Sequence, residues 1–380
     1  MSLQVLALGL LLGAAPPSRD AGTAAAPPLA PDAVALSVLP ERPYVEPGPD
    51  GAQHLNFDLA LNSRAAVPLQ VVKVELDVHA ADGQRVWSRR LERNGFSPGL
   101  AVAAAKQLPA GGQVFLFNPF HSLPRGLELS ALHYRITLEE LEGSQQTLAR
   151  LTVRPRPFAQ GVRLQLPLRG RMFVHSGHDY LAHHRRLDLG HPVLGVLGVT
   201  RNAGRYALDL CASDAQGRLF RGEGKANEEW VGWGAPLYAP GAGTVVVALD
   251  GAKDNRVGGP PYRPDLEELK ANPMENAGNA VVIDHGRGEY SLLAHLQQGS
   301  VSVKVGQRVK AGQQVGRVGM SGDAYIPHVH YELRDGKGAS FGSEGVEGLP
   351  ARFTGFRRVL GQRSEPVALG AVDSGDYLEH

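Results

Sequence analysis

Between about residues 34 and 153, apolar residues of this chain alternate with polar or small ones, and a repeat of 3.6 residues is almost absent. The alternation is clearest at residues 55–61, 72–78 and 132–138. Successive side chains of a strand point to opposite faces of its sheet, so each run would present one apolar face. Beyond residue 157 the chain is again rich in strand-like segments with closely spaced glycines. The sequence therefore predicts an all-β protein.

Turn signals divide the first half into about seven short strands, which is typical of an immunoglobulin-like β-sandwich, predicted here for residues 32–155. The run RPRP at 154–157 is stiff and polar, and we take it as the domain boundary. A second, β-rich domain is predicted for residues 156–345, followed by a C-terminal extension at 346–380 that adds edge strands. Residues 253–278 form a long insertion rich in Pro and Asn.

The first 31 residues are interpreted as a signal peptide followed by an Ala/Pro linker. Residues 3–15 are an apolar run of the length of a signal-peptide core and are too short to span a bilayer, although no Lys or Arg precedes them. A frayed N-terminus is the alternative. We expect an exported protein, periplasmic or extracellular, without a transmembrane anchor.

Charge and cysteine content exclude several classes of protein. The formal net charge is +1, which argues against a nucleic-acid-binding protein. A single cysteine excludes an internal disulfide and any cysteine-rich zinc module. Histidine is the informative residue, because nine of the 14 histidines fall between His175 and His330.

Three short segments bring histidines and a carboxylate into strand-like surroundings. In HVHYEL (328–333), His328 and His330 would point to one face of a strand. The segment LAHL (293–296) places His295 at the end of another strand. In RYALD (205–209), Asp209 lies among apolar residues, and such a carboxylate is costly to bury unless it is paired or bound to a cation.

Five motifs, in order, resemble those of the lysostaphin/LytM-type zinc metallopeptidases, which cleave peptidoglycan. They are GAPLYAPGAGTV (234–245), GNAVVIDHG (278–286), LAHL (293–296), the glycine turns of VGQRVKAGQQVG (305–316) with MSG (320–322), and HVHYEL (328–333). With RYALD, the resemblance covers roughly residues 197–333 and implies a β-rich LytM-type peptidase domain.

The resemblance also implies a role for each of these residues. Asp209 and His330 would be zinc ligands, and His295 and His328 would orient the attacking water and stabilise the transition state. Zinc accepts nitrogen and oxygen ligands in a tetrahedron, with one position open for water in catalytic sites. It lowers the pKa of that water to about 7 and polarises the scissile carbonyl.

One position departs from the commonest pattern of the family, in which a ligand histidine stands four residues before the aspartate. That position is Arg205, whose guanidinium cannot bind zinc. Either the site is inactive, or the missing imidazole comes from elsewhere. The segment AHHR (182–185) before RYALD resembles a variant subgroup with a displaced ligand. By that resemblance His184 is the third ligand, with His183 as the second choice.

The resemblance thus implies a zinc metalloendopeptidase that hydrolyses peptide bonds in bacterial cell-wall peptidoglycan by zinc-activated water. A peptide substrate outside the wall is a further possibility. The alternative is a catalytically inactive family member that binds wall peptides or regulates another cell-wall hydrolase. Which bond is cleaved and the oligomeric state are not readable from the sequence.

Overall fold

A computed structural model of the 380-residue chain describes residues 29–48, 50–93, 100, 107–260, 262–338 and 345–380. The predicted export signal lies outside these ranges. Within them, strands dominate and only two short α-helices occur, α2 (Pro192–Val196) and α3 (Leu266–Ala271). No helix among the described residues is both long and apolar enough to cross a membrane. The prediction of an all-β protein is confirmed.

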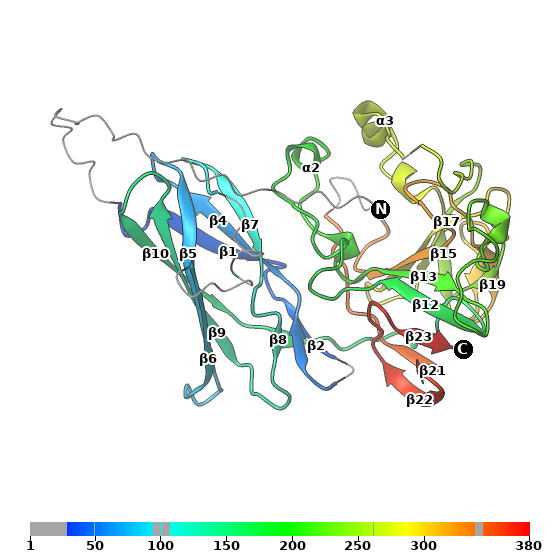
Figure 1. Ribbon diagram of the computed structural model, residues 1–380, viewed down its shortest axis with the longest axis horizontal. Coiled ribbons are helices and arrows are strands. Elements are labelled where there is room, and N and C mark those ends of the chain that lie inside the picture. Colours follow the sequence, from blue (N-terminus) through cyan, green and yellow to red (C-terminus); the bar gives the residue numbers. More distant parts are fainter. Residues whose placement is uncertain (1–28, 49, 94–99, 101–106, 261, 339–344) are drawn as a thin grey trace, which may run out of the picture.

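Two antiparallel sheets of the N-terminal half pack around one apolar core, as a β-sandwich does (Figure 1). The smaller sheet has the order β1 (Val34–Leu39), β4 (Asp58–Ser63) and β7 (Gln113–Phe117). The larger sheet has the order β10 (Gln146–Val153), β9 (Ala131–Glu140), β5 (Leu69–His79) and β6 (Arg85–Glu92). The alternating apolar residues face the shared core, as expected from their period. That this sandwich is immunoglobulin-like stays a prediction.

A small third sheet connects the sandwich to the rest of the chain. Its order is β11 (Arg156–Pro157), β2 (Tyr44–Pro47), β3 (Gln53–Leu55) and β8 (Ser122–Leu123). The two residues of β11 belong to the RPRP segment, and they pair in parallel with β2. The segment predicted as a boundary is therefore hydrogen-bonded to the sandwich side of the chain.

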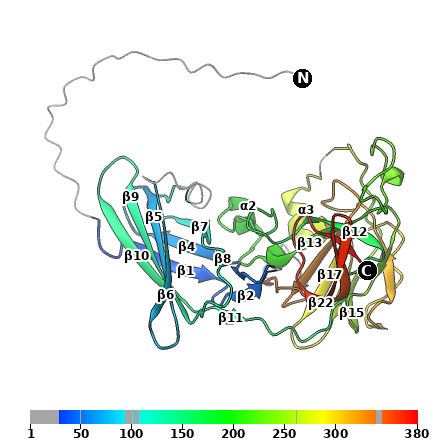
Figure 2. The same ribbon diagram turned by 60° about the horizontal axis from the view of Figure 1, so that its bottom comes forward.

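The C-terminal half is built on one ten-stranded sheet (Figure 2). In spatial order its strands are β18 (Arg308–Val309), β15 (Gly243–Leu249), β16 (Asn279–Asp284), β17 (Tyr290–Leu296), β20 (Val329–Arg334), β13 (Leu208–Ala212), β12 (Arg171–Ser176), β23 (Tyr377–Glu379), β21 (Phe353–Leu360) and β22 (Arg363–Gly370). A two-stranded sheet of β14 (Pro236–Tyr238) and β19 (Gln314–Arg317) packs beside it through the same core.

The last 35 residues continue this sheet. Strands β21 and β22 form its edge, as predicted for the extension, whereas β23 lies between β12 and β21. Short 3₁₀ helices occur in the connections, as η2 (Ala203–Tyr206), η3 (Asn227–Glu229) and η4 (Glu275–Ala277). Helix α3 lies in the long insertion, where Asp265 caps it by accepting from the Glu267 backbone N–H.

Candidate metal centre

The centre of the ten-stranded sheet brings the motif residues together, because β17, β20 and β13 are neighbours in it. In the register of β13 and β20, Asp209 pairs directly with His330. Ala294 of β17 pairs with His330 on the other side, which places His295 next to the same point. Residues separated by 121 positions in the chain thus become adjacent through strand pairing.

The Asp209 carboxylate is buried and surrounded by imidazoles. Its Oδ1 lies 3.0 Å from Nδ1 of His330 and 3.5 Å from Nε2 of both His184 and His328. Burial alone would raise the pKa of Asp209, but the interactions with His184, His328 and His330 outweigh it and hold the pKa well below its ordinary value. Asp209 is therefore an anionic oxygen donor at the centre of a nitrogen-rich site.

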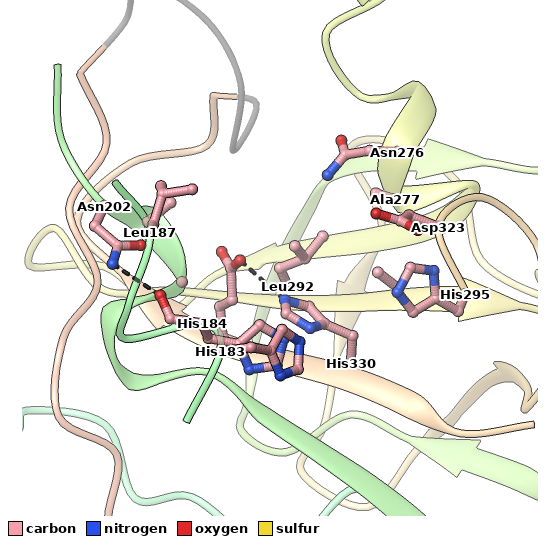
Figure 3. A pocket seen from close by; sticks show the side chains of 14 residues that line it. His183, His184, Leu187, Asn202, Asn276, Ala277, Leu292, His295, Asp323 and His330 are labelled. Atoms are coloured by element: carbon pink, nitrogen blue, oxygen red, sulfur yellow. Dashed lines mark hydrogen bonds and ion pairs between the residues drawn. The ribbon is translucent and has the colours of Figure 1, made fainter. Parts of the chain in front are cut away.

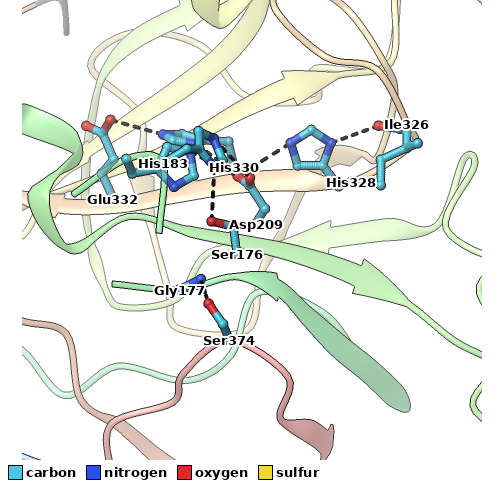
Figure 4. Close-up of polar contacts among 10 residues, drawn as sticks. Ser176, Gly177, His183, Asp209, Ile326, His328, His330, Glu332 and Ser374 are labelled. Atoms are coloured by element: carbon cyan, nitrogen blue, oxygen red, sulfur yellow. Dashed lines mark hydrogen bonds and ion pairs between the residues drawn. The ribbon is translucent and has the colours of Figure 1, made fainter. Parts of the chain in front are cut away.

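His330 is held by carboxylates at both ring nitrogens (Figure 4). Nδ1 faces Asp209, and Nε2 lies 3.0 Å from Oε1 of Glu332, whose other oxygen accepts from Arg334 at 3.2 Å. Burial lowers the pKa of His330, but the hydrogen bonds to the two carboxylates outweigh it and raise the pKa to about 10. A carboxylate behind a histidine is the usual support of a metal-bound imidazole.

The adjacent histidines of the AHHR segment reach the same carboxylate to different degrees. Nε2 of His184 lies 3.5 Å from Asp209 Oδ1, and Nε2 of His183 lies 3.9 Å from Oδ2. The His184 side chain is 12% exposed and that of His183 is 69% exposed. Burial lowers the pKa of His184 to about 3, which keeps its imidazole neutral, the form that binds metals.

His328 and His295 are each anchored through Nδ1 to a backbone carbonyl. His328 Nδ1 donates to Ile326 O and His295 Nδ1 donates to Ser321 O, both at 2.8 Å. These bonds leave Nε2 of each ring for the site, and the two rings lie 5.0 Å apart. His295 also has a positive φ of 63°, which is uncommon for a residue other than glycine and marks a backbone held by its surroundings.

A cavity of about 200 Å³ is lined by His183, His184, His295, His330 and Glu332, whereas Asp209 and His328 are not among its lining residues. Figure 3 shows His183, His184, His330 and His295 along one side of it. Apolar side chains, including Leu187, Leu292 and Ala277, line other parts of its wall. The cavity thus combines a cluster of metal-binding groups with an apolar surface, as expected for a ligand-binding site.

The donor set fits zinc by its chemistry. Within the described residues, donor atoms of His183, His184 and Asp209 all lie within 4.8 Å of one another. His330 joins them through Asp209, and its ring lies 4.7 Å from that of His184. Two imidazoles with one carboxylate, and a fourth position open for water, are a ligand set of catalytic zinc sites, and the Nε2–Glu332 contact supplies the outer support.

Arg205 takes no part in the cluster, because its buried guanidinium points to the N-terminal sandwich. Glu332 was not predicted as a site residue. Its position gave a signal, since it stands two residues after His330 and shares that face of β20.

Comparison with known proteins finds relatives for the C-terminal half. Residues 266–341 match the model of peptidase family M23. The peptidoglycan DD-endopeptidase ShyA of Vibrio cholerae is 35% identical over 100 residues, 26% of this chain and 17% of that protein. The murein hydrolase activator EnvC of Escherichia coli is 37% identical over 70 residues, 18% of this chain and 16% of that protein. Each match thus spans about a sixth of the relative's length.

The solved structure of a zinc-containing peptidase from Vibrio cholerae aligns with 80% of this chain and 83% of its own chain, at 14% identity and a TM-score of 0.25. The M23 match includes His295, His328 and His330 but begins after His184 and Asp209. Those two residues are brought to the site by geometry alone.

Proposed function

We propose that this chain, which belongs to the LytM-type family of M23 peptidases, is a zinc metalloendopeptidase that hydrolyses peptide bonds in bacterial peptidoglycan. The observation that supports the zinc site is the buried, anionic Asp209 carboxylate with His184 and His330 on either side. The substrate is proposed from the relative named as a peptidoglycan endopeptidase. An exported, periplasmic or extracellular location follows from that substrate.

In this proposal His184, Asp209 and His330 hold the metal. Zinc bound there would supply a Lewis acid that activates water and polarises the scissile carbonyl. Glu332 fixes the ring orientation of His330 by accepting from Nε2. The side chains of Asp209, His184 and His330 are largely buried, and electrostatic interactions are stronger in such surroundings than in bulk water.

His295 and His328 handle protons and charge. Because the Nδ1–H of each ring is held by a backbone carbonyl, the lone pair of a neutral ring lies on Nε2, facing the site. Such a nitrogen accepts a proton from water during attack and returns it to the leaving amine. When protonated, it would stabilise negative charge that develops on the substrate carbonyl.

A specific observation also supports the alternative of an inactive regulator. The position of the usual first ligand is Arg205, which is committed to another contact, and one relative is named as a murein hydrolase activator. In this alternative the domain binds wall peptides or acts on another hydrolase.

Zinc content and wall digestion separate the two functions. We expect the purified full chain to contain zinc by elemental analysis and to release soluble fragments from purified peptidoglycan sacculi. His330→Ala should abolish both, whereas His191→Ala, at an exposed histidine that caps α2 outside the cluster, should retain both. A wild-type protein that binds no zinc and releases nothing from sacculi would favour the regulator.

A further inference from the structure

The outer face of β4 is covered by the segment that carries His183 and His184. Leu59 and Leu61 of β4 face the sandwich core, and Ala60, on the opposite face, is buried as well. Ala60 belongs to a second apolar cluster, formed with Phe115 of β7 and with residues 189, 194 and 199. The segment between β12 and β13 therefore packs directly on the sandwich.

A buried ion cluster lies in the same contact. Nη1 of Arg205 is 2.8 Å from Oδ2 of Asp58 on β4, and the two side chains are 0% and 1% exposed. The Nε of Arg205 donates to Glu347, so one guanidinium connects the sandwich to the peptidase half. In addition, Asn56 Nδ2 donates to the backbone carbonyl of Arg205 at 2.9 Å. Both side chains from the sandwich thus hold the 3₁₀ turn η2.

The turn η2 is hydrogen-bonded to the segment that carries His183 and His184. Asn202, just before η2, is buried and donates through Nδ2 to the backbone carbonyl of His184 at 2.9 Å. Asn202 O also accepts from Gly348 N at 3.0 Å. After η2 the chain enters β13, which carries Asp209 three residues beyond Tyr206. One turn therefore lies between two of the proposed ligands and contacts the backbone of the first.

We propose that the N-terminal sandwich is part of the support of the metal centre, with Asp58 and Asn56 as positioning residues that act on His184 through Arg205 and Asn202. The inference rests on the proposed zinc site. A ligand at position 205 would be fixed next to β13, whereas a ligand on a separate segment needs its own packing surface. The outer face of β4 provides that surface.

The first experiment measures zinc binding by the full chain with Asp58→Asn and with Asn56→Ala. We expect the zinc affinity, measured by chelator competition, to fall by about 10–100-fold, as for other outer partners of metal ligands. The absorption spectrum of the cobalt-substituted protein should change as well, because it reports ligand geometry. Asp32→Asn is the matched control, since Asp32 forms an exposed ion pair with Arg64 in the same sandwich.

The second experiment needs no metal. Hydrogen exchange of the metal-free protein should be faster over residues 182–206 in both variants, while strands β16 and β17 stay unchanged. If wild-type protein binds no zinc, the proposed function fails. The exchange measurement still tests whether the sandwich orders residues 182–206, because it needs no metal. If Asp58→Asn does not fold, Asn56→Ala tests the inference in its place. This variant loses only a neutral hydrogen bond and no buried charge. A folded variant with wild-type exchange, or with wild-type zinc affinity and cobalt spectrum, would overturn the inference.

Discussion

Nε2 of His330 lies 3.0 Å from Oε1 of Glu332, on the side of the ring opposite to Asp209. The pair couples a proposed metal ligand to a buried carboxylate from the same strand. Burial raises the pKa of Glu332, but His330 and Arg334 outweigh it and lower the pKa to about 2. Glu332 is thus a carboxylate at any working pH, and it makes the imidazole a stronger donor to a metal.

Glu332→Gln keeps the shape of the side chain and removes its charge. We expect zinc affinity to fall by about 10–100-fold, because an amide oxygen is a weaker acceptor for His330 and orients it less firmly. Chelator competition measures the effect. Glu365→Gln on β22, at an exposed glutamate of the same sheet, is the control. Unchanged zinc affinity in Glu332→Gln would show that Glu332 does not contribute to metal binding.

The two adjacent histidines give a second prediction, which tests the choice of third ligand. His184→Ala should lose zinc, whereas His183→Ala should bind it with a smaller loss of affinity. The reason is that the His184 side chain is 12% exposed beside Asp209, while that of His183 is 69% exposed and costs more entropy to order. Elemental analysis after dialysis gives the zinc content of each variant. The reverse order of zinc loss would make His183 the ligand.

Local patterns predicted the all-β fold correctly, whereas the roles assigned to the site residues stay predictions. The alternation at 132–138 became β9, because the side-chain period is a property of the strand itself. The strand predicted around His330 is β20, but it begins at Val329, so His328 lies just before it and pairs with Gly319 in an isolated bridge. Which side chains meet across the chain depends on the register of distant strands, and a single sequence does not specify that register.

The contact of Arg205 with Asp58 illustrates this limit. The residues are 147 positions apart, and the alternation of β4 places Asp58 on the face that a sandwich normally exposes to water. That face is buried because another segment covers it. The sequence showed that Arg205 replaces the usual ligand histidine, but it did not show that Asp58 is the partner of Arg205.

Arg205→Met tests this buried ion cluster through stability. Removing the guanidinium leaves Asp58 and Glu347 buried without their shared cation, so we expect the free energy of unfolding to fall by about 3–5 kcal/mol. Urea unfolding measures it. Arg64→Met is the control, because its ion pair with Asp32 is exposed and should contribute less than about 1 kcal/mol. Equal losses in the two variants would show that the cluster adds no stability beyond a surface pair.

A second buried pair between the two halves predicts how stability depends on pH. Nδ1 of His178 lies 3.1 Å from Glu46 of β2, and Nε2 faces Val372 O. Burial lowers the pKa of His178, but Glu46, with a smaller effect from Asp373, outweighs burial and raises it to about 9. The ordinary value, taken for the unfolded chain, is about 6.5. The stabilisation is therefore fully present below about pH 6.5 and is lost as the pH rises through about 9.

Glu46→Gln should remove most of this dependence while keeping the shape of the side chain. The measurement is the free energy of unfolding of both proteins at pH 6 and near pH 9.5. Other groups titrate in both proteins, so the informative quantity is the difference between the two changes. The wild type should lose more stability by about 2–3 kcal/mol, the equivalent of its raised pKa. An equal change in both proteins would show that His178 and Glu46 are not coupled, and that this contact between the halves does not depend on the charge of the imidazole.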